Sequence, residues 1–534
     1  MDMSPSTAVR LFLQVFPVTV KTALYHLLRL SENVAKQTLR TELLVAIIRT
    51  LVAIPTPIGR IQAFGNRDQG IKGGIWISKV TIPAPPGGDL ADLVLGAVKD
   101  LDESGLGLAE TGLPDLKAAA IGAEWTGPRG NVAKDAPRPD FEEREHYENL
   151  VKESPGETTI LYFHGGGYFT MDPASHRLTT RALAKSTGGR VLSVRYRLAP
   201  QHPFPCALLD ALQAYLYLIV PPPGAFHEPV KPQHIVFAGD SAGAGLSTSL
   251  LLLLLQFQRT ASTNATPKLQ LDGHSVKVDS SILPAGIALN SPYVDVTHAL
   301  PSVTANAHYD YLFTPPAPTS TTADTTNLAP PEANFQPPPD EHWPTSPPRA
   351  DLYAPVARLL AHPLVSPVMS KDEHWKGSPP VWIADDIAVW DKGTIPGLGG
   401  MPHCFAMLFP TSPSGKTCMK KWAQFAVDIT QPDGHKTGQE AAIISGAYWY
   451  KPRQNVAQER YEVPFERLTS ISDEEVRRLV SASADRAAKR EEEAVRKWER
   501  DAAKLACDEA AEMAIWLDYK ALQRFGPRYI QPYV

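Results

Sequence analysis

Residues 235–245 read I-V-F-A-G-D-S-A-G-A-G, an apolar strand-like run that passes into a turn of small residues. The turn leads into the leucine run of residues 250–255, so G-x-S-x-G lies between a predicted strand and a predicted helix. A serine at the apex of such a turn is held in a strained conformation with its hydroxyl exposed. Ser241 is therefore the predicted nucleophile, and the backbone N–H of Ala242 is a predicted donor to a developing oxyanion.

A second glycine turn, His164-Gly165-Gly166-Gly167, follows another apolar run. Glycines allow backbone N–H groups to converge on one point, and they place no side chain in the path of an acyl group. H-G-G-G after a strand is typical of the oxyanion holes of lipases and esterases. The pattern predicts that the N–H groups of Gly165 and Gly166 act together with that of Ala242.

Between the two turns, residues 194–205 read V-R-Y-R-L-A-P-Q-H-P-F-P. This stretch resembles the Y-R-L-A-P-E-x-P-F-P segment of the hormone-sensitive-lipase-like branch of the α/β-hydrolases, and the three motifs follow one another in the family's order. The resemblance extends from about residue 75 to residue 425. It implies an α/β-hydrolase with a mostly parallel central sheet and helices on both faces, an N-terminal helical cap and a C-terminal helical extension.

The periodicity of the chain supports this fold class, because strand-like and helix-like segments alternate as they do in parallel sheets covered on both faces. Residues 85–145 show only one weak strand, near residues 123–126. The other predicted strands are 74–82 (antiparallel), 159–163, 191–195, 235–238, 286–290 and 381–384, and the helices between them are 174–186, 206–219 and 242–257.

Composition and patterning predict three parts. Residues 1–70 form a helical cap, residues 71–430 the catalytic domain, and residues 431–534 an extension with a charged helix. Within the catalytic domain, residues 314–348 are rich in Pro, Thr and Ala and are predicted to be a surface insertion.

The charged helix of the extension carries a thin apolar stripe between Val476 and Ala488 that predicts docking on the body of the protein or on a partner. Its three consecutive glutamates, Glu491 to Glu493, are predicted to mark a solvated face.

The overall composition excludes some function classes. The chain has 534 residues, 43% of them hydrophobic and 20% charged, so it can bury a sizeable core. Its net charge of −5 argues against a nucleic-acid partner. Its 4 cysteines are scattered, with no C-x-x-C pair, and no metal or cofactor is predicted.

The N-terminal segment, residues 8–30, is apolar but interrupted by Arg10, Pro17, Lys21 and His26. Its longest clean stretch, Leu11–Val20, is about half of what a membrane-spanning helix requires. Two interpretations stay open: a cap helix, or a helix that makes a peripheral membrane contact. No convincing secretory signal is present, so the expected location is intracellular, either cytoplasmic or peripherally membrane-associated.

Met401-Pro402-His403-Cys404-Phe405 resembles the segment that carries the family's catalytic histidine. Because His403 follows Ser241 in the family's order, it is the predicted general base. The family places the acid just after the strand that corresponds to residues 381–384. Asp385 is therefore the first candidate for the acid, followed by Asp386 and Asp391.

The acid is where the sequence departs from the family. The family's motif G-E-E/D-x-L-x-D is absent. Only 18 positions separate Asp385 from His403, whereas a mean helix, a mean strand and their loops take about 20 to 25 residues. A rearranged site, an impaired site and the loss of a short segment all fit this spacing.

The motifs together predict a serine hydrolase that cleaves carboxylic esters, acetyl esters among them, of small or medium size. The alternative is a catalytically impaired protein that binds a small apolar ligand in the old pocket. The plant gibberellin receptors of this branch are such proteins, and they lack the catalytic histidine that this chain keeps as His403. A scaffold built around the C-terminal helix is compatible with either function. The oligomeric state is left open.

Overall fold

The computed structural model describes residues 5–524 except 36, 103–112, 114, 264–267, 272–273, 278–279, 313–336, 385–400, 432–441, 445–459 and 463–470. Its centre is a seven-stranded sheet with the order β1-β2-β4-β3-β5-β8-β9. The strands are β1 (Ile75–Ile82), β2 (Ile121–Pro128), β3 (Thr159–Phe163), β4 (Arg190–Arg195), β5 (Ile235–Asp240), β8 (Gly286–Asn290) and β9 (Val381–Ala384).

Five of these strands run parallel, while β2 is antiparallel to both β1 and β4. The predicted mostly parallel sheet is therefore confirmed, and β3, β8 and β9 begin and end at the predicted residues. The parallel strands read as nearly continuous apolar runs because helices cover both of their faces.

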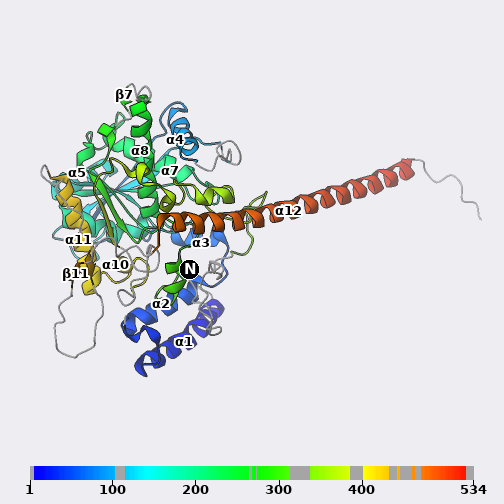
Figure 1. The fold of residues 1–534 in the computed structure, drawn as a ribbon, viewed down its shortest axis with the longest axis horizontal. Helices are drawn as coiled ribbons and strands as arrows, with labels where there is room; N and C mark the ends of the chain where they lie inside the picture. The colour runs from blue at the N-terminus through cyan, green and yellow to red at the C-terminus, as the bar shows by residue number, and fades with distance from the viewer. Residues whose placement is uncertain are drawn as a thin grey trace, which may run out of the picture.

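Successive side chains along a strand point to opposite faces of the sheet, and each face is covered by its own set of helices. Ile160 and Tyr162 of β3 lie in a core with α6 (Arg177–Thr187) and α11 (Pro413–Thr430). Leu161 and Phe163 point to the opposite face, where α4 (Asp89–Asp100), α7 (Cys206–Ile219) and α8 (Ala242–Thr263) pack. Figure 1 shows the two helical layers on either side of the sheet.

The leucine run of α8 is completely buried, with every side chain from Leu250 to Leu255 at 0% exposure. The predicted buried helix is confirmed. It tolerates apolar residues on all sides because it packs on the sheet and is itself covered by α4 and α7.

Sequence patterning did not predict α4 or α5 (Glu143–Glu153). Only His146, Tyr147 and Leu150 of α5 are buried, and such a narrow stripe is a weak periodic signal. The remaining short elements are α9 (Pro301–Ala305), α10 (Phe405–Leu408) and the strand pairs β6 (Lys268–Leu271) with β7 (His274–Lys277) and β10 (Ala442–Ile444) with β11 (Arg460–Glu462).

Three helices precede the sheet: α1 (Pro5–Leu27), α2 (Leu39–Val52) and α3 (Ile58–Gly65). Thr38 begins α2 with a side-chain cap that accepts the N–H of Thr41 at 3.2 Å. In Figure 1, α1 lies against α2 at the lower edge of the molecule, on the side away from the sheet. Among the described residues, no helix is long and apolar enough to cross a membrane.

The predicted insertion at residues 314–348 lies partly outside the described residues. Its described end is attached to the first three helices, because the carboxylate of Asp340 accepts the N–H of Gly59 in α3 at 2.7 Å. The same carboxylate also accepts the N–H groups of His342 and Trp343, which closes a local turn.

The C-terminal helix α12 (Asp473–Arg524) docks its apolar stripe on the body, as predicted. Val476, Val480 and Ala484 are buried, while the far part of the helix extends beyond the body (Figure 1).

One detail of the α12 prediction is wrong. Glu491 does not belong to a solvated face, because its carboxylate accepts the backbone N–H groups of Ala350 at 3.0 Å and Ala357 at 2.9 Å. The two hydrogen bonds from loop amides stabilise the Glu491 carboxylate at a position that helical periodicity alone assigns to solvent.

Candidate active site

Ser241 directly follows β5 and has a left-handed backbone, with φ of 52°. A non-glycine residue in this region costs about 1–3 kcal/mol, and it persists only where the surroundings fix it. Here the N–H of Ser241 donates to the carbonyl of Asn290 at 3.0 Å, and the carbonyl of Ser241 accepts from Gly245 and Tyr293, both at 3.0 Å. The structure therefore has the strained strand–turn–helix that the G-x-S-x-G pattern predicts.

Gly243 is required by close packing between this turn and the end of β3. A Cβ atom at Gly243 would lie 2.0 Å from the carbonyl oxygen of Phe163. Phe163 is the residue before the H-G-G-G turn, so the missing side chain allows the start of α8 to approach that turn directly.

Asp240 connects the two turns through its buried carboxylate. Oδ1 accepts the hydroxyl of Tyr162 at 2.6 Å and the N–H of Gly165 at 3.2 Å, and it lies 3.3 Å from Nε2 of His176. Burial raises the pKa of Asp240, but the neighbouring His176 and Tyr162 outweigh it and hold the pKa below its ordinary value. These contacts show that Asp240 holds the two turns together.

His176 completes this network and was not predicted from the sequence. Burial lowers its pKa, and the charge of Asp240 more than offsets that effect, so the pKa of His176 is raised. The two side chains form a buried ion pair behind Ser241. No local motif marks His176, because its partner is 64 residues away in the chain.

His164 is held as a neutral ring. Its Nδ1 lies 2.7 Å from the carbonyl oxygen of Gly165, and its ring stacks on Tyr196 with 4.4 Å between centroids. Burial, together with the nearby charge of His176, lowers the pKa of His164 to about 4. This environment suits a residue that holds the H-G-G-G turn in place.

The two turns present the three predicted amide donors, two from the H-G-G-G turn and one from the serine turn, in different environments. The N–H of Gly165 already donates to Asp240. Gly166 has φ of 109°, and a Cβ atom there would lie 2.1 Å from the carbonyl oxygen of Thr170, so only glycine fits. Ala242 is the first residue of α8, where a backbone N–H has no partner within the helix.

The histidine loop lies against the serine turn. The N–H of Cys404 donates to Oγ of Ser291 at 3.1 Å, and the sulfur of Cys404 lies 3.8 Å from Oδ2 of Asp240. Cys404 follows His403, and Asp240 precedes Ser241. The fold thus brings the immediate neighbours of the predicted nucleophile and the predicted base into contact.

Asp310 is a second residue that sequence patterning did not identify. Its buried carboxylate accepts the N–H of His403 at 2.8 Å through Oδ2 and the N–H of Leu312 at 2.8 Å through Oδ1. Its backbone carbonyl accepts Nε of Arg49 in α2 at 3.1 Å. Asp310 therefore links the histidine loop to the first three helices.

The predicted acids, Asp385, Asp386 and Asp391, lie outside the described residues. The residue before them, Ala384, ends β9, and its carbonyl accepts the N–H of Ser291 at 2.7 Å. Because Ser291 also bonds Cys404, the chain leaves β9 beside the residue that holds the histidine loop.

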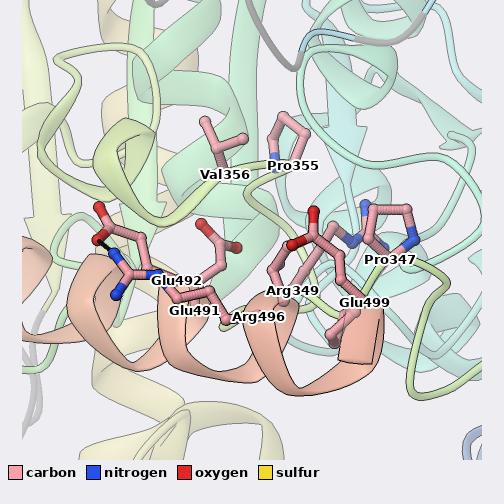
Figure 2. A pocket seen from close by; sticks show the side chains of 10 residues that line it. Pro347, Arg349, Pro355, Val356, Glu491, Glu492, Arg496 and Glu499 are labelled. Atoms are coloured by element: carbon pink, nitrogen blue, oxygen red, sulfur yellow. Dashed lines mark ion pairs between the residues drawn. The ribbon is translucent and has the colours of Figure 1, made fainter. Parts of the chain in front are cut away.

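No group of three or more potential metal-ligating side chains occurs within the described part of the chain. A shallow groove of about 350 Å³ lies between α12 and residues 347–356, with Glu491, Glu492 and Arg496 on its helical side (Figure 2). None of its lining residues belongs to the predicted site, so it does not identify a substrate pocket.

Residues 160–348 match a family model described as the alpha/beta hydrolase fold. The chain is 42% identical to an acetyl-hydrolase of Streptomyces hygroscopicus over 96 residues, which is 18% of this chain and 30% of that protein. It is 30% identical to an esterase of Acinetobacter venetianus over 165 residues, covering 31% and 45% of the two chains. The matched region thus spans less than half the length of these curated relatives.

Among solved structures, a hormone-sensitive lipase from a metagenome library aligns over 72% of this chain and 98% of its own. The sequence identity is 20% and the TM-score is 0.40. An esterase from the bacterial hormone-sensitive lipase family aligns over 81% of this chain and 100% of its own, with 19% identity and a TM-score of 0.36.

Proposed function

We propose that this chain, which resembles the hormone-sensitive-lipase-like α/β-hydrolases, is a serine hydrolase of carboxylic esters. The hydroxyl of Ser241 attacks the ester carbonyl while His403 takes its proton, and the tetrahedral intermediate forms. We assign the oxyanion to the N–H groups of Gly166 and Ala242, because that of Gly165 is already bonded to Asp240. Each such donor contributes on the order of 3 kcal/mol to the transition state.

Collapse of this intermediate expels the alcohol, which receives its proton from His403, and leaves an acyl group on Ser241. A water molecule then repeats the sequence with His403 as base, releasing the acid and restoring the serine. The carboxylate that orients His403 comes from the Asp385–Asp391 segment in this proposal, with Asp385 as first candidate.

The observation that carries the proposal is the contact between the two loops. Cys404 bonds Ser291 and lies beside Asp240, although more than a hundred residues separate the two motifs in the sequence. A protein that had kept only the fold would have no need to keep a serine at φ of 52° and a histidine in a loop packed against it.

The proposed substrates are short- to medium-chain esters, acetyl esters included. Two features support this class. Helices α2 and α3 attach to the loops around the site through Arg49 and Gln62, and Gln62 donates to the carbonyls of Phe169 at 2.9 Å and Ala199 at 3.0 Å. One relative is named an acetyl-hydrolase.

A fluorophosphonate probe and a series of p-nitrophenyl esters test the proposal. The wild type is expected to react with the probe and to hydrolyse acetate and butyrate esters faster than long-chain ones. Ser241→Ala is expected to lose both reactions, while Ser472→Ala, an exposed serine at the start of α12, keeps both. Equal labelling of the wild type and Ser241→Ala would refute the assignment.

The binding-protein alternative gives a different result in the same experiment. A wild type that hydrolyses no ester of the series, yet binds a short-chain ester in equilibrium dialysis, would replace the hydrolase proposal. The presence of His403, which the receptors of this branch lack, favours the enzyme.

A further inference from the structure

The strongest unassigned feature outside the site is the outward face of α1. Exposed large apolar side chains are concentrated there: ten of the eighteen in the described part of the chain lie between residues 9 and 30. On α1 itself they recur at spacings of three and four residues, so they form one continuous stripe. The members of this stripe, called here the α1 stripe, are Val9, Phe12, Leu13, Phe16, Val20, Leu24 and Leu27.

The opposite face of α1 is fixed to α2, and this attachment determines which way the stripe points. Nδ1 of His26 lies 2.5 Å from Oε2 of Glu42, a buried carboxylate that also accepts the hydroxyl of Ser31. Rotating α1 to bury its stripe would break these bonds and leave the Glu42 carboxylate buried without them. The α1 stripe is therefore exposed while α1 is packed on α2. Its exposure does not result from a loss of contact between the two helices.

The charges around the stripe identify its partner. Residues 5–31 contain Arg10, Lys21 and Arg29 and no acidic residue. On a helical projection Arg10 and Lys21 fall beside the apolar stripe, where a long basic side chain can reach the headgroups of anionic lipids while the stripe enters the acyl region. An apolar stripe with a basic edge and no acidic residue is the pattern of helices that lie in anionic membrane surfaces.

We infer that α1 lies in the surface of an anionic lipid bilayer and attaches the protein there through the α1 stripe. The helix does not span the bilayer, because no described helix is apolar enough to do so and because its inner face stays bonded to α2. The geometry agrees with the fold, since α1 is at the edge of the molecule away from the sheet (Figure 1). This inference goes beyond the proposed hydrolysis and does not depend on it.

Vesicle co-sedimentation of the full-length protein tests the inference. The wild type is expected to sediment with vesicles that contain phosphatidylserine and at least tenfold less with pure phosphatidylcholine vesicles or at high salt, because two or three basic side chains each add to the attraction. The double variant Leu13→Ser/Phe16→Ser is expected to lose binding to both vesicles. Arg10→Gln/Lys21→Gln is expected to bind both kinds equally weakly.

The matched control is Leu178→Ser on α6, where an isolated leucine is 81% exposed. It removes an exposed apolar side chain from another face and should bind vesicles as the wild type does. Circular dichroism of each variant checks that the fold is kept. Hydrolysis of a water-soluble p-nitrophenyl ester separates this proposal from the proposed function, since neither α1 variant touches the site.

Three outcomes would overturn the inference. The first is a wild type that ignores phosphatidylserine vesicles, and the second is a Leu13→Ser/Phe16→Ser variant that binds them as well as the wild type. The third is a wild-type dimer in light scattering that this variant converts to a monomer with no vesicle binding in either, which would assign the α1 stripe to a second copy of the chain.

Discussion

The two halves of the proposed site are held in different ways. The serine half is fixed by side chains within the core, where Asp240 bonds Tyr162 and lies beside His176. The histidine half is held by Ser291 through the N–H of Cys404 and, in addition, from outside the sheet, through the N–H of His403 on Asp310 and through Arg49 of α2 on the carbonyl of Asp310. The serine half lies within the α/β core, whereas the histidine half also depends on the helices that precede the sheet.

This difference predicts that the two halves tolerate substitutions unequally. A core network with three buried members permits few substitutions, because each would leave a polar group without its bond. A loop held through backbone groups tolerates changes of sequence as long as the chain path is kept. The sequence departs from the family's acid motif in the histidine half, between Asp385 and His403.

The largest expected effect tests whether the halves act as one unit. Ser241→Ala and His403→Ala should each reduce kcat for p-nitrophenyl butyrate by about 10⁶-fold, and the double variant should be no worse than either single one. Non-additivity is expected because the base has no function without the nucleophile. Steady-state kinetics measure it, and losses that multiply in the double variant would contradict a shared step.

The next effect concerns the acid. We expect one of the three variants Asp385→Asn, Asp386→Asn and Asp391→Asn to lose up to about 10⁴-fold in kcat, the loss seen when a serine-protease triad loses its acid. The other two should change little. The carboxylate holds the tautomer of His403 and stabilises the imidazolium that forms during attack. Three small losses, combined with a large one for Asp310→Asn, would transfer the role to Asp310.

Most of the fold and the serine half were predictable from the sequence because their signals are local. Strands β3, β8 and β9 are short apolar runs bounded by breakers, and G-x-S-x-G is specified within five residues. His176 and Asp310 carry no such signal, because each becomes important through a partner far away in the chain. The wrong expectation for Glu491 has the same cause, since its partners Ala350 and Ala357 are loop amides.

A smaller effect should appear when the buried network of the serine half is disrupted, as a change in the stability of the protein. His176→Gln breaks a buried ion pair and should lower the free energy of unfolding by about 3 kcal/mol. The pKa of His176 is raised and that of Asp240 is lowered. The contribution of the pair is therefore complete between about pH 4 and pH 6.5, the ordinary values of the two groups. It declines as the pH rises through the raised pKa of His176, and again as the pH falls through the lowered pKa of Asp240.

Urea denaturation of the wild type and of His176→Gln at pH 6 and pH 9 measures the change in the free energy of unfolding. His234→Gln is the matched control, because His234 faces the exposed Glu157 at 3.6 Å in a surface pair that contributes less than about 1 kcal/mol. A difference between wild type and His176→Gln that grows toward pH 9 would contradict the assigned ion pair.

The smallest expected effect tests whether the charge of Asp310 acts on His403 in the histidine half. Asp310→Asn keeps the shape of the side chain and an oxygen that can accept the N–H of His403, so the loop should stay in place while one negative charge is lost. Losing an anion that is bonded to the backbone of His403 is expected to favour the neutral imidazole, so the acidic limb of the kcat/KM profile should move toward lower pH. The accompanying fall in kcat should be about tenfold, and Asp295→Asn, which removes another loop-holding carboxylate, should leave the limb unmoved. A limb that stays fixed in Asp310→Asn would show that Asp310 supports only the backbone, and a limb that moves toward higher pH would rule out its charge as a stabiliser of the imidazolium.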